Sequence, residues 1–373
     1  MSFKRIDQAI RNWNHKRIDY LRSLRLRITK CFFDNQSNLI AENQGERNIL
    51  VFRLDDKLGD AVASTGFLNS VKKNYPDCKL IILAGPQTSE IYRGLSFVDD
   101  VLTCKKGFGS LLSAFSQLKK KSFKYVVNTS HILSPRVVML LSLLRAEKKI
   151  GFLNGNYRVF SAVADYDANL DHVTTRYRHL AGLMKIQNPD LNYVLEIKPA
   201  SVAKAQNALA AYKKSGKKII LINSFAGARL RNFSKDTTLK LVKGLIADGN
   251  NVVISVANSG DHRILNEWRS EFSNLTNWIQ LTEFSSLEDN LALLSQSDLV
   301  ITPDTAWVHL ASAQRVNLVA VYREDTDEKN SLIWSPNHKN SKVVMAPNTP
   351  ENPHDINNVS VEAVLNQAKA LLF

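Results

Sequence analysis

Short apolar runs alternate with segments of helical periodicity from residue 48 onward. In the first half, β-rich runs predict strands over 48–53, 79–83, 98–102, 124–128 and 149–152. Apolar spacing between them predicts helices over 60–73, 110–120 and 135–145. The second half repeats the theme, with strands expected over 218–223, 251–256, 278–281, 298–302 and 317–322, and helices over 236–248, 262–271, 287–296 and 305–314. Such alternation is typical of parallel sheets with crossover helices, so we expect an α/β protein with two Rossmann-like halves.

The same pattern suggests how the chain divides into domains. Residues 164–200 lack a clear strand period and are expected to link the two halves. We therefore expect a basic helical segment at 1–45, a first Rossmann-like domain at 46–185 and a second at 186–355. The final segment, 356–373, is apolar at helical spacing and can return to brace the first domain.

The N-terminal segment carries much of the positive charge. Residues 1–30 hold nine Lys or Arg and two Asp, a net charge of +7 within a chain of +14. Its charges are scattered, so we expect no signal peptide and a segment that stays on the mature protein. The apolar positions that recur near helical spacing are Ile6, Ile10, Trp13, Leu21, Leu24 and Ile28. This stripe suits an anionic membrane surface, but it equally suits packing against the protein's own body.

The composition of the chain argues against several classes of protein. The 373 residues are 44% hydrophobic, enough for two buried cores. The three cysteines, Cys31, Cys78 and Cys104, lack paired ligand spacing, so neither a disulfide framework nor a zinc site is expected. The longest apolar runs fall short of the ~20 residues that span a bilayer. Nucleic-acid binding is a further possibility for a basic chain, but no motif of aromatic and basic residues supports it. These features favour a cytoplasmic protein without a metal.

The first candidate site follows the first strand. Residues 53–60 read Arg-Leu-Asp-Asp-Lys-Leu-Gly-Asp, and ligands of open α/β domains bind beyond the carboxyl ends of strands. Gly59 lets the backbone approach a ligand closely, and Asp60 lies near a helix start. Asp60 can equally be an ordinary helix cap, and Lys57 is an ambiguous loop charge.

The second candidate site follows the strand expected at 298–302. There Asp304 and Thr305 open a helix whose N–H groups, with the Thr305 hydroxyl, suit a diphosphate. Both residue types also cap helices routinely. His309 lies about one turn into this helix and can simply satisfy a buried hydrogen bond.

The order of these two motifs on successive halves resembles glycosyltransferase family 9, the lipopolysaccharide heptosyltransferases. Gly59-Asp60 is similar to the family's Gly-Asp, and residues 304–311 are similar to its Asp-Thr-Gly-x-x-His-x-Ala, with Ala306 in place of glycine. Residues 224–233 resemble the loop in which a basic residue precedes Trp-Pro, although Phe233-Ser234 stands there. The loop 53–59 is also one residue longer than the common pattern.

The resemblance implies a GT-B architecture, in which two Rossmann-like domains face each other across a cleft. It implies an ADP-activated heptose donor in the second domain, a lipopolysaccharide core acceptor facing the first, and inversion with Asp60 as general base. Neither a metal nor a cofactor is implied, since the ADP-sugar is itself a substrate. The donor-binding residues implied are Ser224, Arg231, Asp261, Ser285, Asp304, Thr305 and Ala306, with Lys57, Gly59 and His309 in support.

An anionic lipid acceptor also gives the basic leader, residues 1–35, a reason to contact the inner face of the inner membrane. Two alternatives stay open on the same fold, because a fold does not fix an activity. One is a catalytically silent protein that binds nucleotide sugars or acts as a scaffold. The other is a nucleotide-sugar epimerase, which differs in needing no acceptor.

Overall fold

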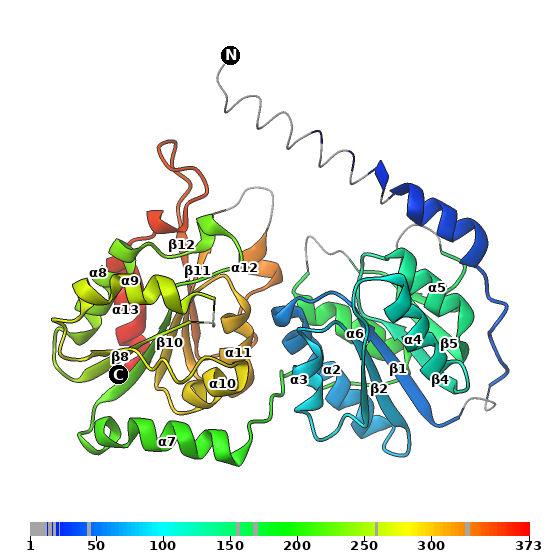
Figure 1. Ribbon diagram of the computed structural model, residues 1–373, viewed down its shortest axis with the longest axis horizontal. Helices are drawn as coiled ribbons and strands as arrows, with labels where there is room; N and C mark the ends of the chain where they lie inside the picture. Colours follow the sequence, from blue (N-terminus) through cyan, green and yellow to red (C-terminus); the bar gives the residue numbers. More distant parts are fainter. Residues whose placement is uncertain are drawn as a thin grey trace.

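Two parallel six-stranded sheets, each with helices on its faces, make up the part of the chain that the computed structural model describes (Figure 1). The described residues are 13, 17, 20, 21, 23–42, 46–153, 157–166, 171–257, 260–324 and 329–373. The strand orders are β3-β2-β1-β4-β5-β6 and β12-β11-β10-β7-β8-β9. The expected α/β class with two Rossmann-like halves is therefore confirmed.

The first sheet is central to the N-terminal domain. Its strands are β1 (Asn48–Arg53), β2 (Lys79–Ala84), β3 (Asp100–Thr103), β4 (Ser122–Asn128), β5 (Arg145–Phe152) and β6 (Ala162–Ala164). Its helices are α2 (Leu58–Asn74), α3 (Ser89–Arg93), α4 (Phe108–Leu118), α5 (Pro135–Leu143) and α6 (Val173–Leu183). β1 is buried along its whole length, with Ile49 and Val51 in one core cluster and Leu50 and Phe52 in another. Helices cover both faces of a parallel sheet, so both sides of β1 are buried. This explains why the residues of β1 form an almost unbroken apolar run.

The second sheet has the same plan. Its strands are β7 (Lys218–Asn223), β8 (Asn251–Val256), β9 (Trp278–Ile279), β10 (Leu299–Pro303), β11 (Asn317–Arg323) and β12 (Ser341–Ala346). Its α-helices are α7 (Pro199–Lys214), α8 (Lys235–Ile246), α9 (His262–Phe272), α10 (Leu287–Ser295), α11 (Ala306–Gln314), α12 (Asn330–Ile333) and α13 (Val361–Leu372). Short 3-10 turns lie at Arg229–Arg231 and Ile356–Asn358.

Two sequence-based expectations about organisation need correction. The segment 164–200 is not only a link, because it contains α6, which packs against α2 in the first domain. The C-terminal helix does not brace the first domain. It packs on the second sheet, where Val364 and Ala368 join the core and Asn317 Nδ2 donates to the Leu371 carbonyl at 3.0 Å. Residues 347–360 connect the edge strand β12 to α13, and Ile356 in this connection already joins the core of the second sheet, so the chain stays on that sheet.

The N-terminal helix is fixed to the first domain at its C-terminal end. Residues 23–33 are helical, and Leu26 and Phe33 pack against a core cluster of that domain. Just beyond it, the Asp34 carboxylate accepts a hydrogen bond from the Val159 N–H at 2.9 Å. No helix among the described residues is long and apolar enough to cross a membrane.

The apolar stripe expected on this helix lies on a different face from these anchors. Trp13, Leu21, Leu24 and Ile28 are 60%, 38%, 39% and 52% exposed. More than a third of each of these side chains is therefore exposed, so the protein's own body covers them only in part. Ile6 and Ile10 lie outside the described residues.

Candidate active site

A cavity of about 590 Å³ lies where the start of α2 meets the start of α11. These helices follow β1 and β10, so the cavity opens at the carboxyl edges of both sheets, where ligands of α/β domains bind. A second cavity of about 400 Å³ adjoins it and shares its lining at Leu58, Gly227, Thr305 and Ala306. Most of the expected site residues line the larger cavity, namely Lys57, Gly59, Asp60, Arg231, Asp304, Thr305, Ala306 and His309.

Asp60 is buried and held by two arginines. It is the third residue of α2, whose N-cap is Lys57, so the ordinary N-cap interpretation of Asp60 is wrong. Its carboxylate is ion-paired with Arg53, and Arg176 Nη2 lies 3.3 Å from Asp60 Oδ1. Burial alone raises the pKa of the Asp60 carboxyl, but Arg53 and Arg176 outweigh burial and bring that pKa below its usual value. The group is therefore a carboxylate at neutral pH.

Arg53 is itself fixed by its surroundings. Its side chain is 1% exposed, its Nε lies 2.8 Å from Asp55 Oδ1, and its Nη1 donates to the Thr129 carbonyl at 3.3 Å. Burial lowers the pKa of the Arg53 guanidinium, but Asp60 and other neighbours more than offset this and keep it charged. Asp60 therefore faces a cation that is locked in place from the first domain.

Arg176 connects Asp60 to the second domain. Its guanidinium carbon lies 5.9 Å from the ring centre of Tyr166, 5.2 Å from that of Tyr177 and 5.6 Å from that of Trp334. Trp334 ends α12 of the second domain and lines the larger cavity. Sequence reasoning missed Arg176 because it lies 116 residues from Asp60, in the segment taken as a link. A buried arginine leaves no periodic signal that could have pointed to it.

His309 packs between the two domains. Its ring lies 5.7 Å from that of Tyr193 and 5.9 Å from that of Trp334, in edge-on arrangements. Burial lowers the pKa of His309 to about 4, so the ring is neutral at physiological pH. A Cβ on Gly59 would lie 2.8 Å from His309 Cδ2. Because α11 approaches α2 so closely here, only glycine fits at position 59 without a shift of the histidine.

The second-domain side of the cavity is built on the start of α11. Thr305 is the N-cap of this helix, and its hydroxyl accepts a hydrogen bond from the Trp307 N–H at 3.1 Å, as an ordinary cap does. Asp304 instead pairs with Arg231, whose Nη1 lies 3.1 Å from Asp304 Oδ2. The Arg231 side chain is 32% exposed, so this pair opens to solvent, unlike that of Asp60.

The other expected donor residues are spread more widely. Asp261 lines the smaller cavity, and burial raises the pKa of its carboxyl. Ser224 is buried, and its hydroxyl lies 2.9 Å from that of Thr238. Ser285 is exposed beside the cap of α10. Neither serine is among the described lining residues of the two cavities, whereas Gln87, Asn290 and Arg323, which the sequence did not single out, are.

The arrangement offers a carboxylate on one wall, and a cation with a helix N-terminus on the other. A carboxylate can take a proton from a hydroxyl, while an arginine and a helix N-terminus bind anionic groups such as phosphates. Among the described residues there is no cluster of three or more His, Cys, Asp or Glu side chains that could hold a metal ion.

Comparisons with known proteins agree on one family. The model of glycosyltransferase family 9 (heptosyltransferase) matches residues 111–361. The chain is 22% identical to a protein of Escherichia coli (strain K12) named "Putative lipopolysaccharide heptosyltransferase 4", over 96% of this chain and 97% of that protein.

Solved structures of low sequence identity share the fold. The glycosyl transferase family 9 structure from Veillonella parvula DSM 2008 gives a TM-score of 0.76 at 17% identity, covering 89% of this chain and 99% of that one. The structure of E. coli ADP-heptose lps heptosyltransferase II gives a TM-score of 0.69 at 18% identity, covering 87% of this chain and 98% of that one. The two-sheet α/β fold is thus the GT-B architecture of heptosyltransferases. Because the family model matches most of the chain, the protein belongs to glycosyltransferase family 9.

Proposed function

We propose that this glycosyltransferase moves a heptose from an ADP-activated donor to a lipopolysaccharide core acceptor, with inversion at the anomeric carbon. The observation that carries the proposal is that Asp60 of the first domain lines the same cavity as Arg231 and Thr305 of the second. A donor diphosphate held by the second domain then presents its sugar to a carboxylate on the first.

Asp60 acts as the general base. As the acceptor hydroxyl oxygen forms its bond to the anomeric carbon, its proton passes to Asp60, and the bond to the diphosphate breaks with its electron pair. The transition state has oxocarbenium character. Arg53 and Arg176 keep the carboxylate ionised and oriented, although they also weaken its proton affinity. The two arginines help catalysis by orienting the carboxylate, because a base acts only within hydrogen-bond reach of the proton that it takes.

The departing diphosphate is stabilised from the second domain. Arg231 and the N-terminus of α11 supply the positive charge that stabilises the diphosphate, as a metal ion does in other enzymes. Arg231 exchanges its contact with Asp304 for the phosphate, and Asp304 holds donor hydroxyls. Ala306 borders both cavities, and Asp261 in the smaller one is suited to the ribose.

We further propose that Ser285 lies near the nucleobase and that Ser224 belongs to the donor-binding residues. Lys57, Gly59 and His309 support the site. No cofactor is required beyond the ADP-sugar substrate. We place the reaction on the cytoplasmic face of the inner membrane, where a lipid-linked core acceptor is within reach of the leader. The likeness of fold to E. coli ADP-heptose lps heptosyltransferase II supports the choice of donor.

The test is product analysis with defined substrates. The protein is incubated with ADP-heptose and a truncated core acceptor, and products are weighed by mass spectrometry, with UDP-sugars as controls. The proposal expects an acceptor one heptose heavier and free ADP. Conversion of the donor without acceptor would instead identify an epimerase, and donor binding without any product would identify a silent binding protein.

A further inference from the structure

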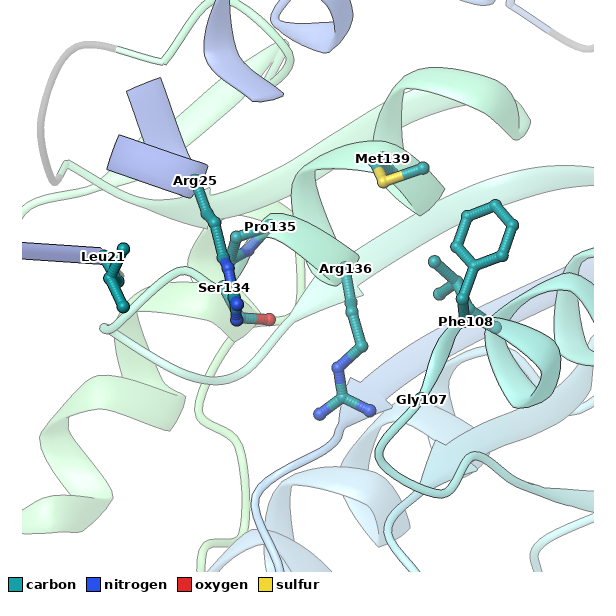
Figure 2. Close-up of a pocket in the computed structure, with 9 residues that line it drawn as sticks. Leu21, Arg25, Gly107, Phe108, Ser134, Pro135, Arg136 and Met139 are labelled. Carbon is teal, nitrogen blue, oxygen red and sulfur yellow. The ribbon is translucent and has the colours of Figure 1, made fainter. Parts of the chain in front are cut away.

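A second hollow lies on the first domain, beside the N-terminal helix. It has a volume of about 780 Å³ and is lined mainly by apolar side chains, among them Leu21, Phe108, Leu111 and Met139. Figure 2 shows Phe108, at the start of α4, beside Met139, in the middle of α5, with Leu21 of the N-terminal helix at the other end of the groove. None of these residues belongs to the cavity that holds Asp60.

Exposed apolar side chains occur in the segments that line this groove. Phe108 is 65% exposed, Leu112 follows it by one helical turn at 50%, and Ile132 precedes the start of α5 at 53%. On the other wall, Leu21 continues into the stripe of Leu24 and Ile28, which the packing of Leu26 and Phe33 leaves uncovered. Contiguous exposed apolar surface of this kind marks an interaction site.

The groove also carries positive charge. Arg25 and Arg136 line it, and the Arg136 Nη1 donates to the Lys105 carbonyl at 3.0 Å, which brings the exposed Lys105 loop to its rim. Among the lining residues that the structure describes, none is Asp or Glu. An apolar floor with guanidinium groups at its edge matches an acyl chain below an anionic headgroup.

We propose that this groove and the exposed stripe Leu21–Leu24–Ile28 form one docking surface for a bilayer that contains anionic phospholipids. Phe108 and the stripe insert between headgroups, while Arg25 and Arg136 contact lipid phosphates. The surface thus extends beyond the basic leader to α4 and α5 of the first domain. This is why the fold leaves apolar groups of both parts exposed side by side.

The position of the surface has a consequence for the acceptor. α4 and α5 begin where β3 and β4 end, at the same carboxyl edge of the first sheet as the start of α2 and Asp60. A bilayer bound there approaches the acceptor side of the cleft and presents a lipid-linked acceptor from it. This consequence rests on the proposed function, whereas lipid binding itself does not.

Vesicle binding tests the surface directly. The full-length protein is sedimented with phosphatidylcholine vesicles that contain or lack phosphatidylglycerol, and the bound fraction gives the affinity. We expect binding that depends on phosphatidylglycerol and falls with salt, and a loss of about tenfold for Phe108→Glu and for Arg136→Glu. Matched controls are Phe373→Glu, an exposed Phe of the second domain, and Arg47→Glu, at the opposite edge of the first sheet, and both should bind like wild type.

The outcomes that overturn the proposal are distinct. Equal binding by the groove variants and their controls, with unchanged unfolding midpoints, would show that the groove does not touch lipid. Normal vesicle binding with weakened use of an acylated acceptor only would make the groove part of the acceptor site instead of a bilayer surface. Vesicle binding needs neither donor nor acceptor. It therefore tests the docking surface independently of heptose transfer.

Discussion

The two walls of the cleft each present an Arg–Asp pair, but the pairs differ in burial. Asp60 and Arg53 have side chains 8% and 1% exposed, and Arg176 adds a second buried cation. Asp304 and Arg231 are 15% and 32% exposed, and Arg231 Nη1 lies 3.1 Å from Asp304 Oδ2. The first pair is a fixed part of its domain. The second is open enough to exchange partners for a phosphate, as the proposed function requires.

Physical chemistry assigns different roles to these pairs. Removing one partner of a buried pair leaves an uncompensated charge and costs about 3–5 kcal/mol, whereas an exposed pair contributes about 0–1 kcal/mol. A group that must be held in one orientation benefits from the first arrangement. A group that must release one anion and bind another needs the second. The difference in burial therefore matches the proposed base on one wall and the proposed diphosphate site on the other.

The largest expected effect is on stability, from replacing the buried cation. Arg53→Met should lower the free energy of unfolding by about 3 kcal/mol, because Asp60 and Asp55 lose their shared buried partner and Asp60 keeps only Arg176. The same change on the other wall, Arg231→Met, should cost about 1 kcal/mol or less. Urea unfolding of both variants measures the contrast. Equal losses would remove the distinction between a fixed and an exchangeable pair.

The contact between the two walls predicts a dependence on pH. His309 has a folded-state pKa of about 4, below the unfolded value of 6.5, so the unfolded chain takes up its proton first as pH falls. Stability should therefore decrease from about pH 6.5 down to about pH 4, by about 3 kcal/mol from this residue. His309→Asn should flatten that part of the profile. Urea midpoints across this range check it, and parallel profiles for wild type and variant would contradict a buried neutral ring.

A smaller effect is expected on donor binding. Arg231→Ala should weaken ADP affinity about tenfold, because one charge-assisted partner of the diphosphate is lost. Arg269→Ala, an exposed arginine at the end of α9, is the matched control and should leave affinity unchanged. Calorimetry with ADP measures both. Unchanged affinity in the Arg231 variant would make Arg231 merely a surface charge.

The sequence predicted well where burial imposes a pattern. β1, β7 and β8 begin and end where expected, because each is apolar and buried on both faces. The edge strands β6 and β12 were not predicted, since β6 is three residues long and β12 exposes Lys342, Val343 and Met345. α6 was missed because buried Arg176 stands on the face that periodicity expects to be apolar.

The candidate site was predicted in part for a similar reason. Motifs at the ends of strands located Asp60 and Thr305, since such residues follow their strands directly in the chain. The sequence could not predict the partners of Asp60, because Arg53 at the end of β1 was only one of several neighbouring charges and Arg176 comes from another helix. Sequence spacing likewise cannot show that Ser224 turns its hydroxyl toward Thr238.

The most direct test of the account compares Asp60→Asn with the wild type in one turnover. Donor affinity is measured with ADP-heptose, folding by the unfolding midpoint, and transfer to the truncated core acceptor by mass spectrometry, with Asp60→Glu as a variant that keeps the charge. We predict that Asp60→Asn lowers the unfolding midpoint, because Arg53 and Arg176 lose their buried anion, but that the protein stays folded and binds ADP-heptose normally. Transfer should be ~10²-fold or more slower, because proton abstraction is lost. Transfer by this variant at the wild-type rate would contradict the assignment of Asp60 as the base.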